Sequence, residues 1–350
     1  MMRGPGVMLS QFMGDAAPFD SLDGVAGWLA GLGYRGVQLP VHDARLIDLE
    51  RAATEDAYCR DLLARLAALG VEITELAAHR AGQLLAVNPA FAEINDAFAP
   101  AALRGDPVAR GAWAERQLRL SIEAAARLGL GRVATFSGAL AWPYFYPWPP
   151  PPPGLIDVAF AELARRWRPL LDHADRHGID LCFELHPGED LHDGVTFDRF
   201  LDAVEHHPRA AILFDPSHML LQQMDYLGFI DLYASRIKAF HVKDAEFIRS
   251  ARSGVYGGFQ DWPRRPGRFR SPGDGQVDFR GIFSRLTAMG YRGWAVLEWE
   301  CCLKRKEDGA REGAPFIARH MIATTEAPFD AALRRTIDPA VAQRILGITP

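Results

Sequence analysis

The sequence predicts a (β/α)8 barrel, that is, a TIM barrel of the α/β class, and three observations support it. Short apolar runs alternate with segments of helical periodicity, which is typical of parallel strands buried between helices. Four runs in the carboxyl half each end in metal-binding residue types. The 350 residues suit one such barrel with insertions at its mouth. We expect a single domain over 1–350, with the barrel at about 7–312 and a C-terminal helical extension at about 313–350.

The amino half supplies four of the expected strands. They are 7–12, 36–42, 71–76 and 132–136, and the intervening helices are 19–32, 55–69 and 108–128. Gly33 and Gly70 mark helix ends, because glycine readily adopts the left-handed conformation found there. A mixed stretch from 77 to 107 is too long for a simple connection, so it should form a lid or short helices at the mouth.

An aromatic and proline-rich stretch, 142–153, follows the fourth strand. Neither a helix nor a central strand tolerates such a run of prolines. We expect a stiff, polyproline-like loop that carries aromatic side chains over the mouth. A surface spacer or an oligomer contact is the alternative.

The carboxyl half continues the alternation. Strands are expected within the runs 181–187, 211–218, 237–244 and 294–300, and helices at 155–177, 197–206, 226–235 and 281–289. A further helical stretch, 314–346 with a break near Pro328, should pack outside the barrel or against a partner subunit. A doubly wound open sheet is the competing fold, but no glycine-rich phosphate loop follows any strand.

Four ligand-type residues fall near the ends of these last strands, namely Glu184, Asp215, His241 and Glu298. Active sites of β/α barrels are built at the carboxyl ends of the strands. Each residue alone could be a solvated strand-end group. Together they would leave several buried charges unpaired, at several kcal/mol each. We therefore predict one divalent ion, and an oxygen-rich ligand set suits Mn²⁺, Mg²⁺ or Co²⁺.

Strand periodicity adds neighbours to this site. Because side chains alternate between the two faces of a strand, His186 shares a face with Glu184, and Lys243 shares one with His241. Glu300 lies on the face of Glu298 in the same way, so either carboxylate could be the ligand of strand eight.

The motifs at these strand ends resemble those of the xylose isomerase-like TIM-barrel superfamily, the sugar phosphate isomerase/epimerase group. They are Phe183-Glu184-Leu185-His186, Asp215-Pro216-Ser217-His218, His241-Val242-Lys243-Asp244, Gly273-Asp274-Gly275-Gln276-Val277-Asp278-Phe279 and Leu297-Glu298. The resemblance implies that Glu184, Asp215, His241 and Glu298 hold the metal. It also implies that Glu184 and Glu298 are the catalytic acid/base pair and that His218 contacts a substrate oxygen.

The chain departs from the family where an arginine is expected shortly after the histidine of strand seven. Arg249 or Arg252 could take that place, within the long segment 245–279, which we predict to be a lid. An oligomer arm is the alternative for this segment. The predicted substrate-binding residues are His186, His218, Lys243, Arg249, Arg252 and Glu300.

The leading functional prediction is a metal-dependent sugar or cyclitol isomerase or epimerase that works through an enediolate. The alternative is a lyase, dehydratase or hydratase acting on a keto-sugar or an oxidised glycoside, with His186 or Lys243 as the additional acid. An endonuclease-IV-like DNA repair enzyme is less favoured, because 268–275 contains no histidine of the required cluster. A non-catalytic binding protein would be expected to have lost ligand residues, yet all four are present.

Composition limits the remaining possibilities. The net charge of −5 is unfavourable for a nucleic-acid partner. Four cysteines without CxxC spacing favour a reducing cytoplasm, and no apolar run is long enough to span a membrane. We expect a small carbohydrate substrate and a homo-oligomer, either a dimer or a tetramer.

Overall fold

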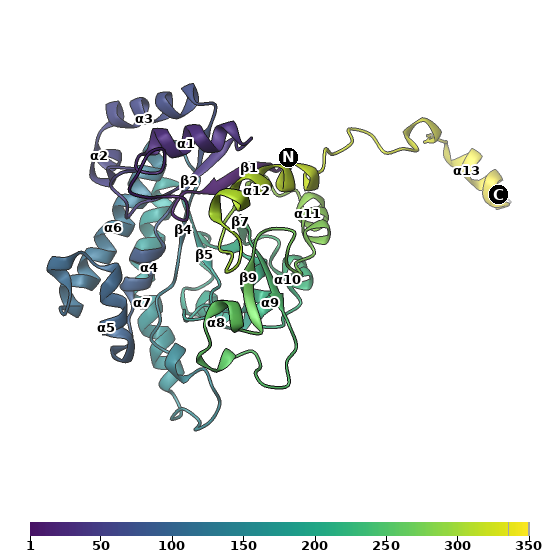
Figure 1. Cartoon of the computed structure of the whole chain (residues 1–350). Coiled ribbons are helices and arrows are strands. Elements are labelled where there is room, and N and C mark those ends of the chain that lie inside the picture. Colours follow the sequence, from purple (N-terminus) through teal and green to yellow (C-terminus); the bar gives the residue numbers. More distant parts are fainter. Residues whose placement is uncertain (335, 349–350) are drawn as a thin grey trace.

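A closed barrel of parallel strands forms the centre of the protein (Figure 1). This structure is a computed structural model and describes residues 1–334 and 336–348. The eight barrel strands run in the order β1-β10-β7-β6-β5-β4-β3-β2, which confirms the predicted TIM barrel. Their bounds are β1 (Arg3–Met8), β2 (Gly36–Pro40), β3 (Glu72–Ala77), β4 (Arg132–Thr135), β5 (Asp180–Glu184), β6 (Ala210–Phe214), β7 (Ile237–Val242) and β10 (Trp294–Leu297).

Small apolar side chains fill the barrel below its mouth. Cys182, Ala211, Leu213 and Ala239 are buried together with Ala134. Because side chains alternate along a strand, these positions also define which residues further along each strand face inward. Residues two positions further along β5, β6 and β7 face the same way, so side chains at the carboxyl ends of these strands point toward one another.

The helices surround the barrel, and those predicted between 19 and 289 are present with ends that differ by a few residues, whereas α2 was not predicted. Asp106 begins α6 by accepting hydrogen bonds from the backbone N–H groups of Val108 and Ala109, which is a standard N-cap arrangement. Gly178, at φ 69°, ends α7. The main helices are α1 (Leu22–Gly31), α2 (Leu49–Thr54), α3 (Asp56–Ala68), α6 (Pro107–Arg127), α7 (Leu155–His177), α8 (Gly194–Ala203), α10 (Tyr226–Tyr233), α11 (Phe279–Ala288) and α12 (Lys306–His320).

Insertions at the mouth contain more regular structure than the sequence indicated. The stretch after β3 forms α4 (His79–Leu85) and, as expected, further short helical pieces. Helix α9 (Pro216–Leu221) follows β6 directly and was not anticipated. The segment after β7 contains an antiparallel hairpin of β8 (Asp244–Phe247) and β9 (Gly267–Arg270). Asp244 is separated from β7 by a single residue, so the sequence offered no visible boundary for a new strand.

The aromatic loop is held down by one buried carboxylate. Asp190 accepts hydrogen bonds at 2.8–2.9 Å from the backbone N–H of Trp142 and of the two residues before it. Trp142 stacks on Phe145, with ring centroids 4.5 Å apart. Phe145 and Tyr146 also contact Tyr256, which lies between the strands of the β8–β9 hairpin. The two long mouth segments therefore meet each other.

The prediction of a helical stretch at 314–346 is wrong in extent. Helix α12 ends at His320 and packs on the barrel, where Tyr34 donates a hydrogen bond to the carbonyl of Ala310. Two β-branched threonines at 324–325 and Pro328 then disfavour helix. Helix α13 (Pro339–Leu346) has no buried residue and extends away from the barrel (Figure 1). Among the described helices, none combines the length and apolar character that crossing a membrane requires.

Candidate metal centre and active site

Four buried side chains converge where neighbouring strands end. Glu184 is the last residue of β5, Asp215 follows β6, His241 lies in β7 and Glu298 follows β10. One ligand atom of each residue lies within 4.8 Å of those of the other three. Since β10, β7, β6 and β5 are adjacent in the barrel, the four side chains share one mouth. The structure thus brings together the four residues that were predicted from the sequence as metal ligands.

The group fits a hard divalent cation. Asp215 caps α9 through Oδ1, which accepts a hydrogen bond from the Ser217 N–H at 2.8 Å. Its buried Oδ2 accepts no hydrogen bond from the described residues. Burial raises the pKa of this carboxyl to about 6, although His218 and Lys243 oppose that shift. His218 Nε2 at 3.3 Å and Lys243 Nζ at 3.7 Å lie near this oxygen without hydrogen-bond geometry. A buried carboxylate oxygen that accepts no hydrogen bond is costly, and a coordinated cation would satisfy it.

A buried chain of polar side chains orients His241, the histidine among the candidate ligands. Gln38 Nε2 donates to Glu75 Oε1 at 2.7 Å, so Gln38 Oε1 faces His241 Nε2 at 3.2 Å. Because that oxygen can only accept, His241 donates from Nε2 and turns Nδ1 toward Glu298 Oε2, 3.0 Å away. Outer partners of this kind fix the ring orientation and the tautomer of metal-binding histidines. Sequence reasoning missed Gln38 and Glu75, whose only signal was a polar residue within an apolar strand.

Replacing Gln38 with methionine is expected to weaken metal binding about 10- to 100-fold, because His241 loses the acceptor that fixes its ring. The volume of the side chain is nearly conserved, so the barrel should still fold. Metal affinity measured by competition with a chelator checks this. Gln117→Met on α6, outside the barrel, is the control and should bind as the wild type does. Unchanged affinity in the Gln38 variant would contradict the orienting role.

Glu184 lies between two imidazoles. Its Oε1 is 3.2 Å from Nε2 of His218, and its Oε2 is 3.0 Å from Nε2 of His79. Although burial raises the pKa of the Glu184 carboxyl, His218 and His79 lower it well below its usual range. The group is therefore ionised. His79, at the start of α4, joins the site, whereas His42, which follows β2, is exposed.

Lys243 places a buried ammonium group beside the ligands. Its Nζ lies 2.9 Å from Glu300, 3.2 Å from Glu298 and 3.7 Å from Asp215. Although burial lowers the pKa of Lys243, Glu298 and the other carboxylates hold it well above its usual value. The ring of Phe269, from β9, lies 4.5 Å from Nζ. The hairpin after β7 therefore reaches the site through Phe269, a contact the sequence did not reveal.

The other predicted substrate-binding residues divide into two sets. His186 packs against His218 with the rings tilted by 55° and their centroids 4.0 Å apart, and burial together with His218 lowers the pKa of His186 to about 3, so it is neutral. Arg249 and Arg252 are exposed in the loop between β8 and β9, and no hydrogen bond or ion pair joins their side chains to another described residue. Their role in substrate binding stays a prediction that requires the loop to move.

The fold and the four converging ligands define a TIM barrel with a candidate metal centre at its mouth. Residues 26–320 match the xylose isomerase-like TIM barrel family, and the chain belongs to that family. This confirms the resemblance seen in the strand-end motifs.

Proteins similar to this chain include a dehydratase by sequence and two epimerases by fold. It is 32% identical over 128 residues to an inosose dehydratase of Bacillus velezensis, an alignment that covers 36% of this chain and 42% of that protein. The chain therefore spans less than half the length of this relative. A 3-keto-D-glucoside 4-epimerase of E. coli superposes with a TM-score of 0.61 at 15% identity, covering 90% and 98% of the two chains. For an L-ribulose 3-epimerase the TM-score is 0.60 at 17% identity, with 92% and 95% covered. The two epimerase structures share the fold of this chain.

Proposed function

We propose that this protein is a metal-dependent lyase that removes water from a keto-sugar or a keto-cyclitol. The sequence alone placed isomerisation or epimerisation first and dehydration second. The similarity to an inosose dehydratase favours the reverse order. The observation that carries the proposal is the buried ammonium of Lys243, a proton donor within 4 Å of two of the candidate ligands.

The candidate ligands Glu184, Asp215, His241 and Glu298 would hold one divalent ion. When bound, the ion supplies Lewis-acid polarisation of substrate oxygens. Although burial lowers the pKa of His241, Glu298 raises it to about 9, so binding of the ion through Nδ1 requires loss of that proton.

The side chains around the ligands match the two proton transfers of a dehydration. An ionised carboxylate, for which Glu184 is our candidate, takes the proton from the carbon beside the carbonyl. The electron pair of that C–H bond forms the new C=C bond, and the hydroxyl on the next carbon departs. Lys243 protonates the departing oxygen, which leaves as water. Glu300 lies 2.9 Å from Lys243 and keeps it charged even when Glu298 and Asp215 serve as ligands.

Epimerisation needs a different pair of groups, a base on each face of one carbon. Glu184 and Glu298 were predicted for those roles. Glu298 is instead engaged by His241 at 3.0 Å and Lys243 at 3.2 Å, while His186, the other spare acid, is neutral. Glu184 contacts the imidazoles of His79 and His218 instead, so the ammonium of Lys243 beside Glu298 is the difference that makes Glu298 the weaker candidate for a base.

The mass of the product separates the two reactions. The metal-loaded protein would be incubated with an inosose and, in parallel, with unphosphorylated ketohexoses. A lyase gives a product lighter by one water, whereas an epimerase gives a stereoisomer of unchanged mass. Formation of stereoisomers alone would overturn the lyase proposal and restore the epimerase. Turnover of the ketohexoses but not the inosose would exclude the cyclitol substrate.

A further inference from the structure

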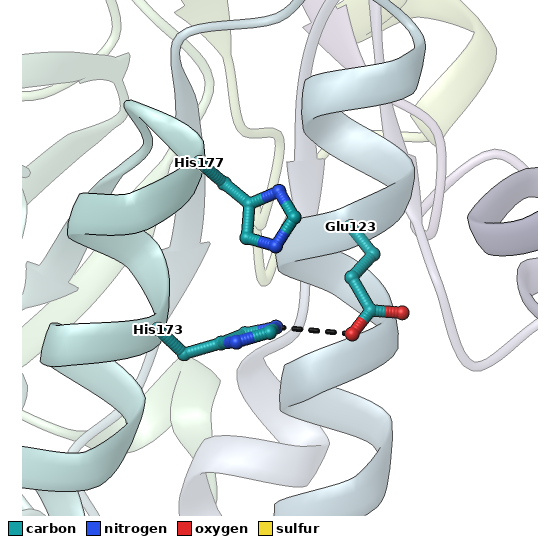
Figure 2. Close-up of side chains that lie close together, drawn as sticks. All are labelled: Glu123, His173 and His177. Carbon is teal, nitrogen blue, oxygen red and sulfur yellow. Dashed lines mark hydrogen bonds and ion pairs between the residues drawn. The ribbon is translucent and has the colours of Figure 1, made fainter.

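A second group of possible metal ligands lies outside the barrel, between α6 and α7. Figure 2 shows His173 and His177 on α7 facing Glu123 on α6. His173 Nε2 lies 3.0 Å from Glu123 Oε1, and the two imidazole rings have centroids 4.7 Å apart. One ligand atom of each residue lies within 4.8 Å of the others. We propose that Glu123, His173 and His177 bind a transition-metal ion, with Zn²⁺ the best match, at a site separate from the mouth.

The spacing of the three residues suits coordination. His173 and His177 are four residues apart, so they lie on one face of α7 a single turn apart. Tetrahedral Zn²⁺ with bonds of about 2.0–2.1 Å places its ligand atoms about 3.4 Å from one another. The separation of His173 and Glu123 is already close to that value. His177 is exposed, so its side chain is free to rotate toward the other two.

The donor types distinguish this site from the mouth. Two imidazoles and one carboxylate match zinc sites that keep a fourth position for water. Imidazole also suits Zn²⁺ better than it suits Mg²⁺, whereas the mouth offers three carboxylates. Burial and the nearby His177 lower the pKa of His173, which favours the neutral imidazole that binds metals.

Nearby cations do not block the site. Arg119 pairs with Glu115 at 2.8 Å, and Arg127 pairs with Asp56. Arg176 contacts His173 Nδ1 at 3.3 Å, yet Arg176 is exposed and can turn toward solvent when Nδ1 carries the proton. Coordination through Nε2 requires that tautomer.

Solvent also reaches the metal position. A surface cavity of about 590 Å³ is lined by Glu123 and His177 together with Cys59 of α3. This opening provides room for a water as the fourth ligand and a path for entry of the ion. A bound ion would join α6 to α7 outside the barrel, whereas the four mouth ligands lie at the carboxyl ends of the barrel strands.

Counting bound Zn²⁺ tests the proposal. Metal-free full-length protein would be titrated with Zn²⁺ in competition with a chromophoric chelator. His177→Ala is expected to bind one Zn²⁺ fewer per chain than the wild type. Glu123→Gln preserves the size of the side chain and removes its charge, so it should bind the same ion more weakly.

Two further variants interpret the count. His206→Ala is the matched control, because His206 is an exposed histidine 3.2 Å from one carboxylate, that of Asp202, and it should bind as much Zn²⁺ as the wild type. Asp215→Asn should remove the mouth ion and leave the outer one. The Zn²⁺ counts of the Asp215 and His177 variants therefore test the mouth site and the outer site separately. Equal Zn²⁺ counts for the wild type and His177→Ala would overturn the outer site. Equal losses in the His177 and His206 variants would also overturn it, as non-specific surface binding.

Discussion

Replacing Asp215 with asparagine is expected to remove the divalent ion from the barrel mouth and to lower kcat/KM by at least about a thousandfold. A catalytic metal stabilises the transition state by several kcal/mol, and each 1.36 kcal/mol is a factor of ten in rate. Asparagine retains an oxygen that can accept from the Ser217 N–H and so preserve the cap of α9. The variant therefore removes the charge at Oδ2 without removing the helix cap.

Metal content and kinetics, measured on the same sample, check this result. Asp225→Asn is the control, because Asp225 caps α10 in the same way, accepting from the Gly228 N–H at 2.9 Å. The control should retain both the ion and the activity. If the Asp215 variant bound the ion with wild-type stoichiometry, the ligand assignment would be wrong.

Replacing Lys243 with methionine should lower kcat about 10²- to 10⁴-fold, the usual contribution of a positioned proton donor. The bound ion should remain, because none of the four candidate ligands is altered. Methionine fills most of the same buried space without the ammonium group. The measurement is kcat together with the number of metal ions per chain.

Lys238→Met provides the matched control for this change. Lys238 lies near the amino end of the same strand, β7, away from the mouth, so its replacement should leave kcat unchanged. Wild-type turnover by the Lys243 variant would exclude this residue as the acid. Loss of the ion would instead mean that Lys243 acts by organising the carboxylates.

The cluster of candidate ligands at the strand ends could be predicted because two independent patterns coincide there. Buried apolar runs locate the strands, and the barrel topology makes the ends of four of them neighbours. Alternation did not separate Glu298 from Glu300, since both face the same way. The structure does, because Glu298 is buried beside His241 while the side chain of Glu300 is 40% exposed and pairs with Lys243.

Contacts that come from distant parts of the chain could not be predicted in this way. Gln38 and Glu75 lie on β2 and β3, and their position behind His241 depends on closure of the barrel. Phe269 reaches Lys243 because β9 folds back on β8. In the amino-acid sequence these residues are one amide, one carboxylate and one aromatic among many.

Helix pairing outside the barrel was equally hidden. Periodicity correctly placed the long helices that became α6 and α7, but it did not reveal which of their faces meet. The proximity of Glu123 to His173 depends on that packing. The tail after α12 was overpredicted as helix because its apolar residues have helical spacing, although the described part of 321–348 buries none of them.

Titrating the metal-free protein with Mn²⁺ while following loss of water from an inosose tests the central claim most directly. The four mouth ligands suit Mn²⁺, and the proposed chemistry depends on it or a similar ion. We predict no turnover before metal is added and a rise that reaches its plateau at one activating Mn²⁺ per chain. Full dehydratase activity in the metal-free protein would contradict the account.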